Sequence, residues 1–308
     1  MDLPLAVLQA LRPKQWTKNV LLFAALIFSR KFNDIELIQQ ACWGFVAFSF
    51  LSSAGYIVND ARDKEADRLH PKKSKRPIAS GRLPLNIAYV EAVIVFVLGC
   101  VIAWWVSQMV TPDSRSLLWM EDRRHVPWFL LVSLLYFATT MSYSLVFKNM
   151  VILDVMFIAA GFLWRATAGA IAIGVDISPW LLTCTAFLAL FLGFNKRRGE
   201  VVLLAQEASN HRKNLAEYTP ELIIEFQAIT TSGTIISYAL YTVLGSPTKW
   251  LLLTLPFVLY GVFRYMYLVS VKAEGGAPDE TLYKDRPILV TCILYGVTAI
   301  GIMWGFAG

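Results

Sequence analysis

Four oxygen-bearing side chains stand close together in the sequence, at spacings that favour joint binding of a cation. They are Asn59, Asp60, Asp63 and Asp67, and they end a long apolar segment. If one helix ran through all four, at ~100° per residue, their side chains would share one face. Crowded carboxylates repel one another unless a cation lies among them, and hard oxygen ligands suit Mg²⁺, which keeps waters and substrate phosphates as its other ligands. The spacing predicts a Mg²⁺-diphosphate site at a membrane surface, with Asn59, Asp63 and Asp67 as ligands and Asp60 beside them.

A second interpretation of the same stretch is a solvated helix end held by ion pairs. Arg62, Lys64, Arg68 and Lys72 lie at helical spacing from the acids and could pair with them. The two interpretations differ in what neutralises the carboxylates, a bound metal ion or the cations of the chain itself.

A dense basic block, HPKKSKRPIASGR at residues 70–82, follows the acids. Its lysines and arginines, among them Lys75 and Arg76, could grip phosphate through charge-assisted hydrogen bonds. Arg76, next to Pro77, is the strongest candidate. The alternative is a loop that only sets membrane topology and touches lipid headgroups.

Three further polar residues lie near a tight turn or inside an apolar run. Tyr143 and Lys148 flank the turn, where the lysine could point into the bundle and meet a phosphate or snorkel to the membrane interface. Arg165 lies well inside an apolar run, and an arginine there is costly in lipid. It should therefore face an internal cavity and bind an anion, with Asp154 as a candidate structural partner.

The last polar groups stand where apolar runs end or begin. One run ends in FLGFNKRRGE, which contains Lys196, Arg197 and Glu200. Arginines at an inner membrane boundary are also ordinary topology signals. Asp285 and Arg286 stand at the start of the final run, where they would form an ion pair or a second phosphate contact.

The sequence lacks the usual parts of acid-base and nucleophilic catalysts. It has three histidines and no G-x-S-x-G, Walker-type, H-E-x-x-H or dinucleotide-binding glycine motif. The chemistry that remains is electrophilic and is driven by a metal that holds a diphosphate leaving group.

Composition indicates that membrane-spanning helices must position these groups. Hydrophobic residues make up 56% of the chain and charged residues 16%. These fractions and a mean hydropathy of +0.54 predict a polytopic membrane protein. The cysteines lie in apolar runs and read as small buried hydrophobes. Apolar runs predict nine helices in one all-α domain over residues 1–308, at 17–32, 36–58, 85–109, 126–147, 150–174, 179–195, 227–246, 249–270 and 287–306.

Charge sorts the two sides of this predicted bundle. Most lysines and arginines fall on the side that holds the N-terminus, which the positive-inside rule makes cytoplasmic. The polar clusters above lie on that side, at or beside the predicted loops 59–84, 147–150, 195–226 and 271–287, whereas Arg165 lies inside a predicted helix. The formal net charge of +6 is then explained by topology and anionic lipids, and it gives no support for nucleic acid as a partner.

These motifs resemble the UbiA-type intramembrane prenyltransferase superfamily over nearly the whole chain. RPKQWTKN, NDARDKEADRLHPKKSKRPIASG, YSLVFK, WRATAGA, KRRGE and KDRP resemble its decaprenyl-phosphate phosphoribosyltransferase branch more closely. The resemblance implies a nine-helix fold in the bacterial inner membrane with a site facing the cytoplasm. It implies transfer of ribose 5-phosphate from phosphoribosyl diphosphate (PRPP) to a polyprenyl phosphate, for cell-envelope glycan synthesis. The site residues it implies include Lys14, Lys18 and Asn19 for substrate and Lys148 for catalysis.

One departure from the superfamily pattern bears on the substrate. Typical members carry a second Asp-rich motif where this chain reads NKRRGE. If the prenyl chain carries one phosphate and acts as acceptor, Lys196 and Arg197 suit that anion better than aspartates would. Two rival functions stay open, an aromatic or quinone prenyltransferase with a prenyl diphosphate donor and a non-catalytic lipid-binding or transport protein. A homo-oligomer also stays open.

Overall fold

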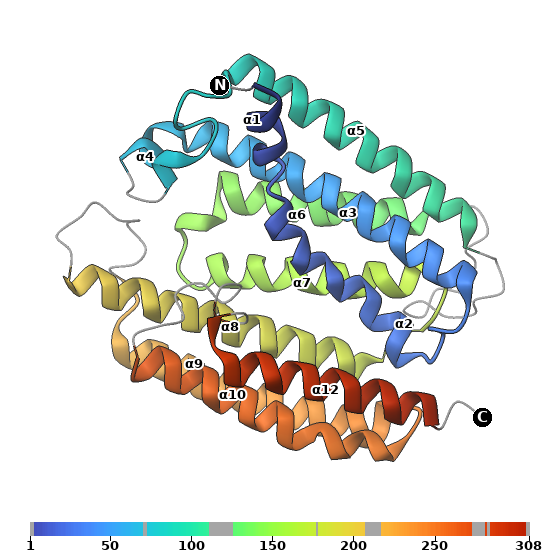
Figure 1. The fold of residues 1–308 in the computed structure, drawn as a ribbon. Coiled ribbons are helices and arrows are strands. Elements are labelled where there is room, and N and C mark those ends of the chain that lie inside the picture. Colours follow the sequence, from blue (N-terminus) through green and yellow to red (C-terminus); the bar gives the residue numbers. More distant parts are fainter. Residues whose placement is uncertain are drawn as a thin grey trace. The chain divides into compact units, whose positions relative to one another are not determined.

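The computed structural model of the 308-residue chain describes residues 3–69, 73–110, 126–176, 178–206, 217–272, 281 and 284–305 (Figure 1). Helices and turns make up these ranges, with no strand among them, so the all-α prediction is confirmed for the described residues. Seven helices there are long and apolar enough to cross a membrane, and each coincides with a predicted run. The runs predicted at 17–32 and 227–246 are the two that differ.

The chain forms two compact units whose segments interleave along the sequence. Unit 1 comprises Met1–Leu26, Lys31–Ser144 and Trp164–Asp176, and unit 2 comprises Ile27–Arg30, Leu145–Leu163 and Ile177–Gly308. The expectation of one domain over residues 1–308 stays a prediction.

Unit 1 is built around a long helix that carries the acidic motif at its end. Its elements are α1 (Leu3–Ala10), η1 (Pro13–Phe23), most of α2 (Ala24–Phe28), α3 (Ile35–Arg62), α4 (Lys64–Arg68), η2 (Lys73–Lys75), α5 (Leu85–Met109), α6 (Trp128–Leu145) and the second half of α7 (Leu153–Ala172). Asp34 begins α3, because its carboxylate accepts hydrogen bonds from the N–H groups of Glu36 and Leu37 at 3.0 and 3.3 Å.

Small residues let the unit 1 helices approach closely, as membrane helices require in the absence of a hydrophobic drive between them. A Cβ added to Gly99 of α5 would lie 2.9 Å from Leu51 of α3. A Cβ on Gly169 of α7 would lie 2.2 Å from the carbonyl oxygen of Leu22 in η1. Both positions therefore need glycine for packing.

The first predicted run does not form one α-helix. Residues 13–23 form the 3₁₀-helix η1, and only Ala24–Phe28 are α-helical. Arg12 precedes η1 with φ 53°, a left-handed conformation, and Pro13 follows. Because proline disfavours an α conformation in the residue before it, the turn at this point separates η1 from α1.

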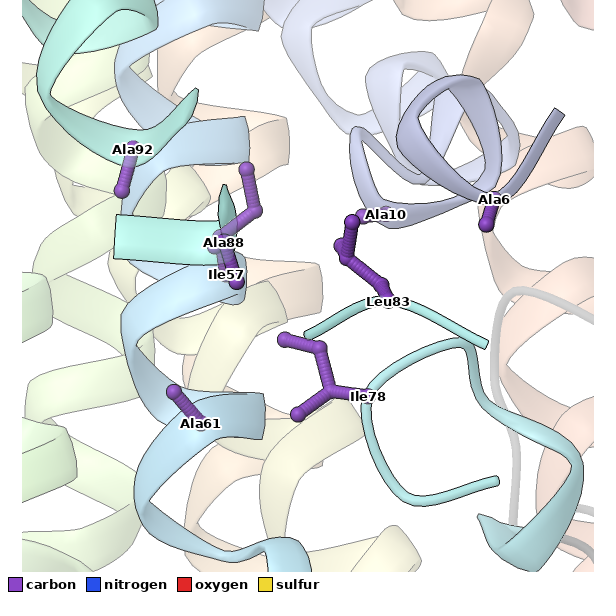
Figure 2. Packing of buried hydrophobic residues seen from close by; sticks show 8 residues of the cluster. All are labelled: Ala6, Ala10, Ile57, Ala61, Ile78, Leu83, Ala88 and Ala92. Carbon is purple, nitrogen blue, oxygen red and sulfur yellow. The ribbon is translucent and has the colours of Figure 1, made fainter. Parts of the chain in front are cut away.

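A cluster of buried apolar side chains fastens α1 and the basic loop to the ends of α3 and α5. Figure 2 shows it, with Leu83 next to Ala10 of α1, Ala6 on the same helix, and the Ile78 side chain of the loop pointing toward α3. The other members are Ile57, Ala61, Ala88 and Ala92. The loop after residue 72 is therefore held in place by packing.

Unit 2 contains the remaining helices. They are η3 (Phe147–Asn149), the first half of α7, α8 (Pro179–Gln206), α9 (Pro220–Leu240), the π-helical turn η5 (Tyr241–Gly245), the 3₁₀-helix η6 (Lys249–Thr254), α10 (Leu255–Ser270) and α12 (Arg286–Gly305). Phe191 of α8, Tyr265 of α10 and Ile288 of α12 belong to one buried cluster. The seventh predicted run began too late, because Thr219 caps α9 by accepting from the N–H of Leu222, and Pro220 takes the first helical position.

Candidate active site

The acidic motif lies where α3 ends and α4 begins, in unit 1. The expectation of one unbroken helix through the motif is wrong, because α3 ends at Arg62 and α4 starts at Lys64, with Asp63 between them at φ −87° and ψ 9°. The backbone hydrogen bonds from Asp63 to Asn59 and from Asp67 to Asp63 keep their helical spacing at 2.9 and 2.8 Å. The break is therefore slight, and the acids stay on a turn of helix-like backbone.

Two arginines neutralise the buried acids of the motif. Asp60 and Asp67 are each 4% exposed. One nitrogen of Arg76, Nη1, lies 3.0 Å from Asp60 Oδ1 and 2.6 Å from Asp67 Oδ2. Arg12 grips Asp60 as well, through Nε at 3.1 Å and Nη2 at 2.5 Å. For Asp60 and Asp67 the ion-pair interpretation is confirmed, and the cations that the described structure places on them, Arg12 and Arg76, come from outside the helix that carries the motif.

The donor chemistry of the predicted metal ligands fits Mg²⁺. Asn59, Asp63 and Asp67 offer an amide and two carboxylates, and Mg²⁺ binds through one or two carboxylates with waters and phosphates as further ligands. Asp60 and Asp67 converge on a guanidinium nitrogen, so the site already accommodates positive charge between carboxylates. No trio of Asp, Glu, His or Cys side chains gathers in metal-binding geometry within the described ranges.

The basic loop is fixed by Arg68, at the end of α4, and by its own Arg82. Arg68 Nε donates to the carbonyl oxygen of Ala79 at 3.1 Å. Arg82 donates to the carbonyl oxygen of Lys75 and to Gln9 Oε1 of α1, both at 2.8 Å. The Lys75 side chain is exposed, whereas residues 70–72, with the candidate Lys72, lie outside the described residues. The loop therefore holds Arg76 against the acids.

The other unit 1 candidates divide between the surface and the interior. Lys14 is exposed, and Lys18 Nζ donates to Gln15 Oε1 at 2.6 Å. Asn19 is fully buried and bridges two helices, donating to Ser49 Oγ at 3.1 Å and accepting from Arg165 Nε at 2.7 Å.

Arg165 also meets an aromatic partner in the interior of unit 1. Its Nη2 donates to the hydroxyl of Tyr136 at 2.7 Å, and its guanidinium carbon lies 4.6 Å from the centre of that ring. Tyr143 is partly buried near the end of α6. Next to it, the carbonyl oxygen of Ser144 accepts from Arg62 at 2.9 Å.

In unit 2, a strained turn follows Lys148. Lys148 is 9% exposed and lies in η3. Ile152 has φ 70°, which is rare for a β-branched residue and marks local strain. Its N–H donates to the hydroxyl of Tyr218 at 2.8 Å, and that hydroxyl donates to Asp154 Oδ1 at 2.6 Å. Burial, together with the neighbouring Asp154 carboxylate, raises the pKa of Tyr218 well above its usual value, so it stays a donor.

Arg197 lies in a buried ion-pair network. Its Nε is 2.9 Å from Asp154 Oδ2, with side-chain exposures of 1% and 0%, and it also pairs with Glu200. The acid considered as a partner of Arg165 thus pairs with Arg197. Lys196, one residue earlier, is partly exposed.

A chain of amides joins α8 to α9 beside this network. Gln227 donates to Asn195 Oδ1 at 2.6 Å and accepts from Arg198 at 2.8 Å. Gln227, Tyr218 and Arg12 are all missing from the predicted site. Tyr218 shortly precedes the apolar run predicted at 227–246, and Gln227 begins it. Polar residues at the end of a predicted membrane helix are the sequence feature that could have marked both as candidates.

Asp285 and Arg286 do different jobs at the start of α12. Asp285 pairs with Arg264 at 2.8 Å and accepts from the N–H of Ile288 at 3.0 Å, so it caps the helix. The hydrogen bond from Arg264 lowers the pKa of Asp285. Arg286 is exposed. The predicted cytoplasmic loops also include residues 207–216, 273–280 and 282–283, which lie outside the described residues.

Comparison with known proteins places this arrangement among membrane transferases. Residues 20–112 match the model of the UbiA prenyltransferase family. A decaprenyl-phosphate phosphoribosyltransferase from Corynebacterium glutamicum is 34% identical over 94% of this chain and 84% of its own length. One from Mycobacterium tuberculosis is 30% identical over 96% and 94%. A UbiA homolog from Archaeoglobus fulgidus, solved bound to GPP and Mg²⁺, superposes with a TM-score of 0.69 at 18% identity over 97% of this chain and 99% of that one, which shows the shared fold.

Proposed function

The chain belongs to the UbiA prenyltransferase family, and we propose that it transfers 5-phosphoribose from PRPP to a polyprenyl phosphate with release of diphosphate. The observation that carries the proposal is the likeness to decaprenyl-phosphate phosphoribosyltransferases over nearly the whole length of both chains. The replacement of a second acidic motif by NKRRGE supports it, because a basic segment suits a lipid monophosphate acceptor.

For the donor, the site that we propose is the acidic motif with Arg76, in unit 1. Asn59, Asp63 and Asp67 would hold Mg²⁺, which when bound neutralises charge on the departing diphosphate. Arg76 already points its guanidinium at two buried carboxylates and can exchange them for diphosphate oxygens. Lys75 on the same loop and Arg68 at the end of α4 supply further positive charge.

For the acceptor, the residues that we propose lie at the basic end of α8, in unit 2. Arg197 is engaged by Asp154 and Glu200, so we assign it to holding the helix end and its positive field in place. Lys196, which is partly exposed, is then the direct contact to the lipid phosphate, with Lys148 as a second candidate.

No general base is needed for the proposed transfer. A phosphate monoester has its second pKa near 6, so the acceptor oxygen is already ionised near neutral pH. The scissile bond joins ribose C1 to the diphosphate, and the lipid phosphate oxygen forms the new bond to C1. Direct displacement predicts inversion, from an α donor to a β-linked lipid. The absence of a motif for a catalytic base in the sequence agrees with this chemistry.

The topology proposed for this integral membrane protein has nine spans, with the N-terminus and the site in the cytoplasm of a bacterial inner membrane. The seven long apolar helices supply most of the spans, and α9 and the η1–α2 segment would supply the other two. The excess of lysine and arginine in the loops on one side supports the orientation.

The proposed function is tested with purified protein, ribose-labelled PRPP and a polyprenyl phosphate. Label that moves into a lipid extract, and does so only with Mg²⁺ present, supports the proposal. Product formed only from a prenyl diphosphate and a phenolic acid would instead show an aromatic prenyltransferase. Binding of both substrates without any product would show a lipid-binding protein.

A further inference from the structure

We propose that Arg12 is a positioning residue of the donor site. It neutralises Asp60 and thereby leaves Arg76 available for the diphosphate of the donor. The inference rests on the proposed function, since it assigns a task within the site that would bind PRPP.

Arg12 engages both carboxylate oxygens of a buried acid. Its Nη2 lies 2.5 Å from Asp60 Oδ1 and 2.6 Å from Oδ2, and its Nε lies 3.1 Å from Oδ2. A planar guanidinium fork of this kind is matched to one carboxylate in a way that a lysine is not. Both carboxylate oxygens of Asp60 are therefore occupied by Arg12, and we leave Asp60 out of the proposed metal ligands.

The surroundings of Arg12 hold it in this position. Its left-handed backbone, at φ 53°, is fixed by hydrogen bonds to the carbonyl of Gln9 and from the N–H of Gln15, at 3.2 and 2.8 Å. Its guanidinium carbon lies 5.2 Å from the centre of the Tyr56 ring, one helical turn before Asp60. A residue in a rare backbone conformation persists only where its neighbours determine it, and such residues cluster at functional sites.

Charges alternate along the chain of contacts from Arg12 through Asp60 and Arg76 to Asp67. Asp60 Oδ1 is shared, at 2.5 Å from Arg12 and 3.0 Å from Arg76. With Arg12 in place, the charge of Asp60 is already compensated. If Arg12 were removed, Arg76 would be the one cation left on Asp60 among those that the described structure shows. Because an uncompensated buried charge is costly, Asp60 would then retain Arg76 and oppose its move to a diphosphate.

The competition between Asp60 and the diphosphate for Arg76 makes a prediction that would not follow if Arg12 contributed only packing. Arg12→Ala should weaken the binding of Mg²⁺-PRPP roughly ten- to a hundredfold, because Arg76, retained by Asp60, would no longer make its charge-assisted contact with the diphosphate. Adding Asp60→Asn to Arg12→Ala should recover most of that affinity, because it removes the charge that retains Arg76. Arg12→Lys should fall between the wild type and Arg12→Ala.

The measurement is calorimetric binding of Mg²⁺-PRPP to the full-length protein in detergent, without polyprenyl phosphate, so that no turnover contributes. Arg264→Ala is the matched control, since Arg264 also holds one carboxylate, that of Asp285, through Nε and Nη2 at 3.3 and 2.8 Å, but lies in unit 2 and has no part in the proposed donor site. It should leave the dissociation constant within about twofold, which is under ~0.5 kcal/mol.

The outcomes separate this inference from the proposed function. If the wild type does not bind Mg²⁺-PRPP, the proposed function fails and the inference fails with it. If the wild type binds and Arg12→Ala binds equally well, the inference alone is overturned. It is also overturned if Arg12→Ala and Arg264→Ala weaken binding alike, or if adding Asp60→Asn to Arg12→Ala does not restore affinity.

Discussion

Removing the charge of Asp154 should destabilise unit 2 far more than removing that of Glu200, although both acids pair with Arg197. Asp154 and Arg197 have 0% and 1% of their side chains exposed, with 2.9 Å between Oδ2 and Nε. Removing one partner of a buried pair costs about 3–5 kcal/mol, because the other charge is left in a poorly solvated place. Since Glu200 remains as a counter-ion, we expect Asp154→Asn to cost about 3 kcal/mol of unfolding free energy.

Glu200→Gln is the control, because the Glu200 side chain is 29% exposed. A partly solvated pair contributes up to about 1 kcal/mol, so this variant should cost no more than that. The assay is denaturant unfolding in mixed micelles, followed by tryptophan fluorescence. Combining Asp154→Asn with Arg197→Met should recover stability, because it removes the uncompensated cation. Equal losses in the two single variants, or no recovery in the double variant, would refute the assignment of a buried structural pair.

Four further predictions concern the site and its strain. Asp63→Asn should lower turnover more than tenfold, a loss above ~1.4 kcal/mol of transition-state stabilisation, with normal thermal stability by melting; retained turnover would place the metal elsewhere. Lys196→Ala should raise the KM for polyprenyl phosphate roughly ten- to a hundredfold and leave that for PRPP unchanged, and steady-state kinetics with each substrate varied would show the reverse if this lysine served the donor. Ile152→Gly should relieve a left-handed conformation, raise the unfolding free energy, and so partly offset the ~1–3 kcal/mol lost in Tyr218→Phe when the two are combined; a lower unfolding free energy for Ile152→Gly than for the wild type would contradict the strain. A cysteine at Ser74, in a cysteine-free background, should resist an impermeant thiol reagent in intact cells, and its labelling would invert the topology.

Sequence patterns identified the apolar helices and the acidic motif because both are local. The length of each apolar run is sufficient to locate α3, α5 and α12. The spacing from Asn59 to Asp67 covers only consecutive helical turns, so it can be recognised in a short stretch of sequence. The break at Asp63 and the 3₁₀ backbone of η1 depend on tertiary packing, which no short window contains. The start of α9 could have been predicted from the sequence, because Thr219 is a typical N-cap residue and Pro220 a typical first helical residue.

Contacts between side chains far apart in the sequence could not be predicted from local sequence patterns. Arg12 and Asp60 are 48 residues apart, and Tyr218 and Asp154 are 64 apart. The sequence shows that buried acids need compensation, but the choice of cation follows from the packing of α1 and the basic loop. From the sequence, Arg197 was expected to bind a lipid phosphate. The structure pairs it with the carboxylate of Asp154, which the sequence around Arg197 does not contain.

The most direct test of the central claim follows separate labels in the donor. Purified protein is incubated with Mg²⁺, polyprenyl phosphate and PRPP that carries one isotope in the ribose 5-phosphate and another in the diphosphate. Phosphoribosyl transfer predicts that the 5-phosphoribose label enters the lipid extract, that the diphosphate label stays in water as free diphosphate, and that the two appear in equal amounts. Lipid that gains the diphosphate label, or an extract with neither label while the protein turns over a prenyl diphosphate, would contradict the proposed reaction.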